Sequence, residues 1–204
     1  MPDYPAEFFR RVDESPDLDF YREPRFVTHI DTATIDALTA FYADFIAPGA
    51  DVLDLMSSWI SHLPTDIAYG RVVGVGMNEA ELARNPQLSE YRIHDLNVAP
   101  ELPFDTDSFD RATIAVSIQY LIQPVEALSD VHRVLRRQGK LCIAMSHRLF
   151  PTKAIMAFQT LDAGDRVRVV SAYLAQAGFT DIEFIDRSPA HADPLWLVVG
   201  TSGK

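Results

Sequence analysis

The chain has 204 residues, of which 48% are hydrophobic and 23% are charged, a composition that fits one globular domain and excludes wholesale disorder. Its net charge of -11 disfavours a nucleic-acid partner, and its single cysteine, Cys142, excludes an internal disulfide. Because no segment resembles a signal peptide or approaches the ~20 apolar residues of a membrane span, we expect a cytoplasmic protein, monomeric or homodimeric, that binds a small molecule.

The first 30 residues form an irregular, proline-bearing stretch in which a short helix is predicted near residues 6–12. Apolar residues then recur at helical spacing from Ile35 to Phe45. Asp31 or Thr32 can cap this helix, and Pro48 with Gly49 can end it.

Strands and helices alternate from residue 51 onward. Asn78 is a predicted helix N-cap with Glu81 at capping-box spacing, and Gly139 and Gly178 are predicted helix stops. The last two strands are joined without a helix, which predicts an antiparallel pair. The predicted strands are 51–55, 71–75, 91–93, 111–117, 141–145, 179–185 and 195–199, and the later helices are 125–137 and 166–177.

This alternation predicts an α/β fold, because short apolar strands separated by helices form right-handed crossovers and a mainly parallel sheet. We expect a Rossmann-like three-layer sandwich with a seven-stranded sheet and a C-terminal antiparallel strand pair. One domain should span residues 1–204, with 1–30 as an arm or lid on a core of 31–204.

Three segments carry a family resemblance. They are D-V-L-D-L at 51–55, E-L-P-F-D-T-D-S-F-D at 101–110 and A-L-S-D-V-H-R-V-L-R-R-Q-G-K-L at 127–141. In this order they resemble landmarks of class I S-adenosylmethionine-dependent methyltransferases of the type 11 kind, over roughly residues 33–145. The resemblance implies methyl transfer from S-adenosylmethionine to a small-molecule acceptor.

The expected cofactor site lies at the carboxyl ends of the first four strands, because ligands of open α/β sheets bind where the strand order reverses. The resemblance implies that Asp54 holds the methionine end of the cofactor. It also implies that the Asp95 carboxylate accepts from the adenine amine while the Leu96 amide meets a ring nitrogen. The further cofactor positions that we predict are Met56, Ser57, Ser58, Gly76, Met77, Asn78 and Ser117.

The chain departs from the family pattern at two places. Met56-Ser57-Ser58-Trp59-Ile60 stands where the family has glycines, and Met56 and Trp59 are not expected to copy glycine's backbone freedom. We expect Ser57 and Ser58 to contact the amino-acid end of the cofactor instead, beside the positive end of a helix. Gly76 replaces the family's ribose-binding acid, so Asn78 either bonds the ribose or only caps its helix.

Three histidines are candidate bases, His62, His147 and His29, because imidazole titrates near neutral pH. His62 can instead brace the loop. Polar side chains after the fourth and fifth strands and on the arm are candidates for the acceptor site, with Arg148 suited to a carboxylate. The alternatives are a solvated loop whose Pro151 begins a helix, and an arm that only straps the sheet edge. The predicted acceptor residues are Arg25, Trp59, Gln119, Tyr120, Ser146, Arg148 and Lys153.

No histidine pair has metal-ligand spacing, so no metal is expected. Two other functions stay open from the sequence. One is non-methyl chemistry on the same fold with the same cofactor, and the other is a non-catalytic binding protein derived from a methyltransferase.

Overall fold

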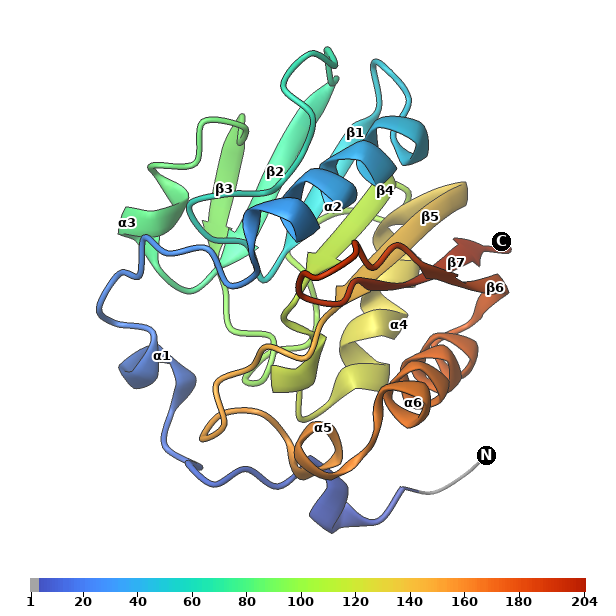
Figure 1. Ribbon diagram of the computed structural model, residues 1–204. Helices are drawn as coiled ribbons and strands as arrows, with labels where there is room; N and C mark the ends of the chain where they lie inside the picture. The colour runs from blue at the N-terminus through green and yellow to red at the C-terminus, as the bar shows by residue number, and fades with distance from the viewer. Residues whose placement is uncertain (1–3) are drawn as a thin grey trace.

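The sheet has seven strands in the order β3-β2-β1-β4-β5-β7-β6 (Figure 1). The computed structural model describes residues 4–204, so Pro2 of the predicted arm lies outside the described residues. The sheet confirms the predicted Rossmann-like architecture. Its strands are β1 (Asp51–Leu55), β2 (Arg71–Gly76), β3 (Glu90–Ile93), β4 (Phe109–Ala115), β5 (Leu135–Met145), β6 (Phe179–Asp186) and β7 (Trp196–Ser202).

Strands β1 to β5 run parallel, and β7 is antiparallel to both β5 and β6. The predicted C-terminal antiparallel pair is therefore confirmed. The chain builds outward from β1 to β3 and then returns to place β4 on the other side of β1. This reversal puts the switch point between β1 and β4, where a ligand cleft is expected.

Helices cover both faces of the sheet (Figure 1). Helix α2 packs on one face through Leu38 and Tyr42, which share a buried cluster with Val52 of β1. The next β1 residue, Leu53, points to the opposite face and joins the cluster that contains α4 and α6. The helical segments are η1 (Ala6–Phe9), α1 (Asp17–Phe20), α2 (Thr32–Phe45), α3 (Glu79–Leu82), η2 (Ile118–Tyr120), α4 (Pro124–Val134), α5 (Met156–Thr160) and α6 (Ala163–Gln176).

Two of the predicted caps form. The Asp31 carboxylate accepts from the Thr34 amide at 2.9 Å and begins α2. The Asn78 side-chain oxygen accepts from the Glu81 amide at 3.1 Å and begins α3. The reciprocal half of the predicted capping box is absent among the described residues, because the Glu81 carboxylate accepts from Ser58 Oγ and from the Arg25 amide instead.

The crossover from β1 to β2 differs from the expectation, because residues 56–70 contain no helix in the described chain. The expected helix after the β1 loop is wrong. A helix-free crossover leaves the loop without the partial positive charge that a helix start supplies.

Two helix boundaries are also corrected. The helix predicted to reach residue 137 ends at Val134, because Arg136 extends into β5 and binds Asp51 at 2.9 Å and Asp110 at 2.7 Å. Gly139 lies within β5, where a Cβ would come within 2.8 Å of the Arg136 carbonyl. Pro151 does not begin a helix, since α5 starts at Met156.

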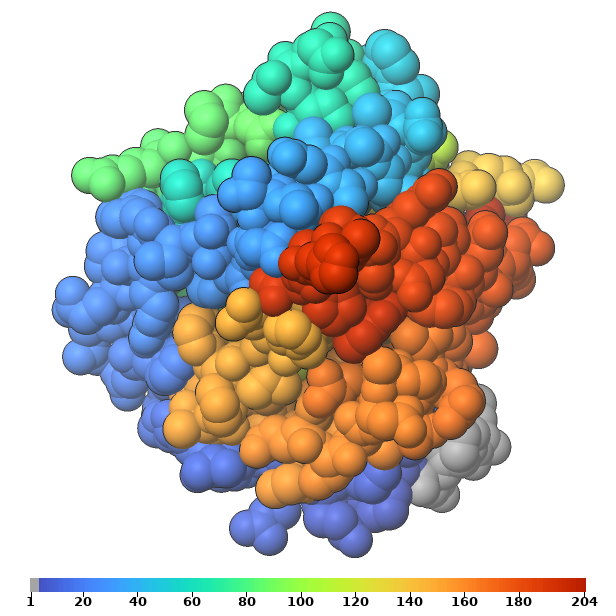
Figure 2. All heavy atoms as spheres, in the orientation of Figure 1, coloured from blue at the N-terminus to red at the C-terminus, as the bar shows by residue number. Residues whose placement is uncertain are grey.

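The N-terminal arm, residues 4–30, crosses the carboxyl ends of the strands before it enters α2 (Figure 1). Backbone hydrogen bonds tie it to the segment after β5, from Asp13 N to Thr152 O and from Met156 N to Arg10 O, both at 2.8 Å. In Figure 2 the blue arm lies directly against the yellow-orange surface of that segment. The arm is therefore part of the packed molecule.

Candidate functional site

One cavity of about 1160 Å³, including its open mouth, lies at the carboxyl ends of β1, β2, β3 and β4. The four loops expected to surround a single crevice do so, and Tyr21, Arg25 and His29 of the arm add a further wall. Other lining residues are Asp54, Met56, Ser57, Ser58, His62, Gly76, Met77, Asn78, Glu81, Asp95, Leu96, Asn97, Val116, Ser117, Tyr120 and Phe150.

Asp54, at the end of β1, anchors the loop that follows it. Its carboxylate accepts from Ser57 Oγ at 2.5 Å, Ser61 Oγ at 2.6 Å and Thr113 Oγ1 at 3.1 Å. The residue is only 2% exposed, and this burial raises the pKa of Asp54 to about 6. Asp54 thus fixes the loop that lines the cavity.

The rewritten loop reaches a glycine-like conformation without glycine. Met56 has φ 54° and His62 has φ 58°, both in the left-handed region that non-glycine residues rarely occupy. The expectation that Met56 cannot copy glycine is therefore wrong for the backbone. Val116, after β4, has φ 50° and lines the same cavity. Such strain gathers at functional sites when the surrounding structure holds it in place.

Gly76 explains how the loop finds room. A Cβ on Gly76 would lie 2.4 Å from the Ser57 carbonyl oxygen, which crosses the end of β2. The Ser57 amide also donates to the Val75 carbonyl at 2.8 Å. The close backbone approach is thus made possible by a glycine on β2 instead of glycines in the β1 loop.

The hydroxyl protons of both loop serines are used inside the protein. Ser57 donates to Asp54, and Ser58 donates to the Glu81 carboxylate at 2.5 Å. What these serines offer a ligand is their oxygen lone pairs, which can accept from an ammonium group. The expected helix end beside them is absent from the described crossover.

Glu81 and Asn78 connect the arm to the site. Glu81 accepts from the Arg25 amide at 2.6 Å, and Asn78 Nδ2 donates to the carbonyls of Tyr21 at 2.8 Å and Arg22 at 3.0 Å. Asn78 therefore caps its helix through its side-chain oxygen and holds the arm through its side-chain nitrogen. Both ends of the amide have protein partners. Sequence reasoning treated Glu81 only as part of a cap, although its position in the first turn after β2 placed it at the cavity.

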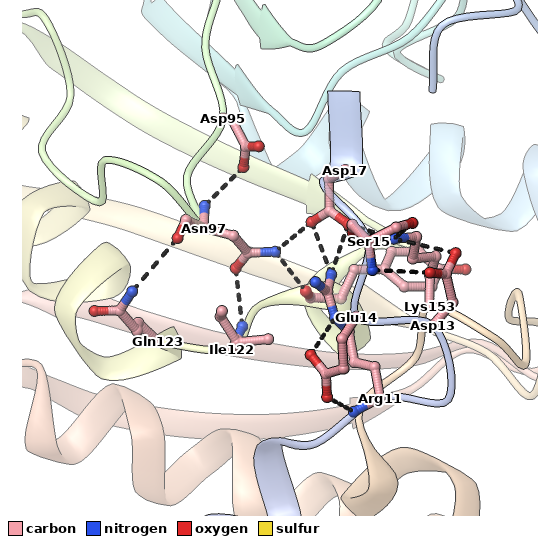
Figure 3. Close-up of polar contacts among 11 residues, drawn as sticks. Arg11, Asp13, Glu14, Ser15, Asp17, Asp95, Asn97, Ile122, Gln123 and Lys153 are labelled. Atoms are coloured by element: carbon pink, nitrogen blue, oxygen red, sulfur yellow. Dashed lines mark hydrogen bonds and ion pairs between the residues drawn. The ribbon is translucent and has the colours of Figure 1, made fainter. Parts of the chain in front are cut away.

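Asp95 and Leu96 line the cavity at the end of β3, as expected. Asp95 Oδ1 accepts from the Asn97 amide at 2.9 Å, which leaves its other oxygen without a protein partner among the described residues. Asn97 Nδ2 donates to Asp17 Oδ2 at 2.8 Å and to the Tyr120 carbonyl at 2.9 Å, while its Oδ1 accepts from Ile122 N at 2.9 Å (Figure 3). The Asp95 loop is thereby tied to the arm and to η2.

Two of the three candidate bases lie at the cavity. Burial lowers the pKa of His62 to about 4 and lowers the pKa of His29, so both imidazoles are neutral at pH 7. The Nδ1 atom of His62 is buried without a hydrogen-bond partner. His147 lies outside the cavity lining, with Nε2 2.9 Å from Asp193 Oδ1.

Only some of the predicted acceptor residues lie at a cavity. Arg25 and Tyr120 line the cavity, and Arg148 lines a smaller neighbouring cavity that also touches His29 and Phe150. Trp59 donates from Nε1 to the Val27 carbonyl at 3.0 Å and so braces the arm. The side chains of Gln119, Ser146 and Lys153 are buried and line neither cavity, and Arg148 Nε donates to Asp193 at 3.0 Å.

Lys153 is fully buried and has a structural role. Its ammonium donates to the Ser15 carbonyl at 2.6 Å and lies 3.2 Å from Asp17 and 3.3 Å from Asp13 (Figure 3). Arg11 Nη1 also donates to Asp17 at 2.6 Å. The basic loop after β5 therefore holds the arm through Lys153, a role that the sequence did not reveal because Ser15, one of its partners, is 138 residues away.

No helix of residues 4–204 has the length and apolar character needed to cross a bilayer. Within the same range, no three metal-ligating side chains of His, Cys, Asp or Glu converge as a metal site would require.

Comparison with known proteins agrees with this geometry. Residues 57–143 match the methyltransferase domain family. A 68-residue stretch is 40% identical to the ubiquinone/menaquinone biosynthesis C-methyltransferase UbiE of Citrifermentans bemidjiense. This stretch covers 32% of this chain and 27% of the relative. The chain therefore spans about a quarter of that relative's length. The matches confirm the resemblance to class I methyltransferases.

Solved structures share the fold. An S-adenosylmethionine-dependent methyltransferase from Mesorhizobium loti has a TM-score of 0.59 at 17% identity, with 82% of this chain and 99% of that chain covered. The [4+2]-cyclase SpnF has a TM-score of 0.62 at 16% identity, with 81% of this chain and 80% of that chain covered. At these identities the likeness is one of fold.

Proposed function

We propose that this chain, whose residues 57–143 match the methyltransferase domain family, transfers a methyl group from S-adenosylmethionine to a small-molecule acceptor. The observation that carries the proposal is the cavity at the switch point, bordered by the loops after β1, β2, β3 and β4. Its volume of about 1160 Å³, open mouth included, has room for a small molecule, because sites for small molecules measure about 300–1,000 Å³.

The residues at the cavity fit the cofactor. Ser117 Oγ and His62 Nδ1 line it and are buried without partners, so a polar ligand would satisfy them. Asp95 would accept from the adenine amine with its unpaired oxygen, beside the Leu96 amide. Ser57 and Ser58 would accept from the ammonium group. Met56, Gly76 and Met77 would make van der Waals contacts with the cofactor. Asp54 would hold the β1 loop in place.

The cofactor supplies a methyl group on a positively charged sulfur. When it is bound, a lone pair of the acceptor would displace the sulfur from that carbon, and the carbon–sulfur electron pair would remain with the neutral thioether. The chain's part is alignment, which can lower such a barrier by up to ~7–11 kcal/mol. Any proton on the acceptor would pass to the neutral imidazole of His62 or His29.

We further propose a cytoplasmic enzyme, monomeric or homodimeric, that does not act on nucleic acid. The net charge of -11 supports this, because it repels phosphate backbones. A single buried thiol, Cys142, also suits a reducing compartment.

The direct test is isothermal titration with S-adenosylmethionine and with S-adenosylhomocysteine, followed by mass spectrometry of candidate acceptors for a methyl gain. Asp95→Asn should weaken both cofactors more than tenfold, about 1.4 kcal/mol or more. The reason is that the amide keeps the Oδ1 acceptor for Asn97 but presents a donor to the adenine amine. The exposed acid control, Asp105→Asn, should change nothing. A folded protein that binds neither cofactor would refute the proposed function.

A further inference from the structure

Arg25 is a cation without a counter-ion at the cavity. One guanidinium nitrogen, Nη2, donates to the Phe20 carbonyl at 2.8 Å. The other, Nη1, is buried without a partner, and within residues 4–204 the side chain makes no ion pair. A buried donor without an acceptor costs about 1–3 kcal/mol, so this atom is poised for a ligand oxygen.

Four carboxylates line the same cavity, and within residues 4–204 none of them forms an ion pair with Arg25; Asp95 accepts from the Asn97 amide, and the other three have stronger partners. Asp17 is bound by Arg11 and Lys153, and Asp54 accepts from three hydroxyls. Glu81 accepts from Ser58 and from the Arg25 backbone amide, not from its guanidinium. The positive charge of Arg25 is therefore not neutralised by its acidic neighbours.

Aromatic rings surround this cation. The guanidinium carbon lies 4.5 Å from the Phe20 ring centre, 5.6 Å from that of Tyr21 and 5.5 Å from that of Phe150. Tyr120 stacks on Phe150 at 5.9 Å with an interplanar angle of 29°. Burial raises the pKa of Tyr21, so its hydroxyl remains a hydrogen-bond donor. Flat rings on the wall of a cavity favour a flat ring in the ligand.

Phe150 places this cluster on the acceptor side. Phe150, Tyr120 and His29 border both the main cavity and the smaller one next to it. The smaller cavity is not lined by Asp54, Ser57 or Asp95, where the cofactor is proposed to bind. A ligand group that reaches Arg25 from this side need not displace the cofactor.

From these contacts we infer that Arg25 binds the anionic oxygen of a flat, conjugated acceptor, a ring that carries a carboxylate or phenolate, held between Arg25 and the rings of Tyr120 and Phe150. The inference rests on the proposed function and narrows its acceptor class. Guanidinium suits this task because it can meet a carboxylate with two parallel hydrogen bonds. The main rival source of an anionic oxygen is the carboxylate of the cofactor itself.

The test compares benzoate with benzamide and acetate by ligand-observed NMR, with and without saturating S-adenosylhomocysteine. Benzoate should bind at least tenfold tighter than neutral benzamide or ring-free acetate. Arg25→Gln should weaken benzoate at least tenfold while S-adenosylhomocysteine affinity stays within twofold. The matched control is Arg22→Gln, because Arg22 lies on the same arm but its side chain is exposed and pairs with Asp19.

Several results would overturn the inference. Equal binding of benzoate and benzamide would do so, as would unchanged benzoate affinity in Arg25→Gln. If Arg25→Gln weakens S-adenosylhomocysteine but not 5′-methylthioadenosine, which lacks the amino-acid end, Arg25 belongs to the cofactor. If Arg25→Gln does not fold, two other measurements test the same point. Arg25→Lys should weaken benzoate binding, and benzoate binding to the unmodified protein should weaken as salt is added; the absence of both effects would overturn the inference.

The outcome separates this inference from the proposed function. If benzoate binding depends on Arg25 but the protein has no affinity for S-adenosylhomocysteine, the anion site stands and the proposed methyltransferase function is refuted. Cofactor binding without any preference for benzoate would do the opposite.

Discussion

Asp54, which is buried, and His62, which is half-buried, are ionisable residues whose pKa values shift in opposite directions. Burial raises the pKa of Asp54 from 3.8 to about 6, so its contribution to stability is present at acid pH and is lost as pH rises from about 4 to about 6. Burial lowers the pKa of His62 from 6.5 to about 4. Its contribution is present above pH 6.5 and is lost as pH falls toward 4. The two effects oppose each other over the same pH range.

Asp54→Asn should therefore make the protein more sensitive to acid, and His62→Gln should make it less sensitive. The Asp54 shift corresponds to about 3 kcal/mol, at 1.36 kcal/mol per pKa unit. The measurement is the free energy of unfolding in urea between pH 7 and pH 4.5. The exposed acid Asp36 provides a control, Asp36→Asn, which should follow the unsubstituted protein. A parallel pH dependence in all four proteins would contradict the assignment.

At this scale the sequence located the residues that strand ends position. Asp54, Asp95 and Gly76 were named because the family resemblance points to the carboxyl ends of the parallel strands, and each lies at or just beyond such an end. Glu81 was treated only as a cap residue although it follows β2 closely, and Asp17 and Asn97 were not named because they meet only where the arm crosses the β3 loop. The positive φ of Met56 could not be predicted, since it arises from the fixed contacts of its neighbours.

At the scale of elements, the β1 loop and the end of β2 act as a pair.

The sequence predicted the strands well because their apolar runs are short and bounded by turn residues. It failed at the β1 to β2 crossover, where we expected the positive end of a helix beside Ser57 and Ser58, because residues 56–70 form no helix. It also extended α4 into β5, because the apolar spacing continues while Arg136 is drawn to Asp51 and Asp110.

Gly76→Ala tests the pairing of these elements. Its Cβ would lie 2.4 Å from the Ser57 carbonyl, so we expect the loop to shift, the melting temperature to fall and cofactor affinity to drop more than tenfold. Gly164→Ala is the matched control. Its Cβ would meet no atom closer than 3.5 Å, and it should stabilise α6 by about 0.4–1 kcal/mol. Normal cofactor affinity in Gly76→Ala, measured by titration, would show that the loop can relax.

At the scale of the whole molecule, the arm is joined to the sheet from two sides. Asn78 and Glu81 hold it at the β2 side. Lys153 and Asn97 hold it at the opposite side, through Asp17 (Figure 3). The sequence predicted an arm or lid but not its partners, because contacts between residues 56 or more positions apart leave no local pattern.

Asn97→Asp should loosen the arm. The variant keeps the oxygen that accepts from Ile122 but turns the donor to Asp17 into an acceptor. The loss of a bond to a charged group costs about 2 kcal/mol. Hydrogen exchange over residues 11–21 should accelerate at least tenfold, with α2 unchanged. Gln123→Glu, the same amide-to-acid change at an exposed neighbour, should not have this effect, and equal exchange in both variants would contradict the arm's dependence on Asn97.

The attachment of the arm at both ends has a kinetic consequence. A ligand enclosed beneath it can leave by that route only as fast as the arm detaches, so its residence time would be set by the protein and not by its own contacts. Detachment of the arm would then limit how often the cavity can be emptied and refilled, whatever the affinity of the ligand for the residues beneath it.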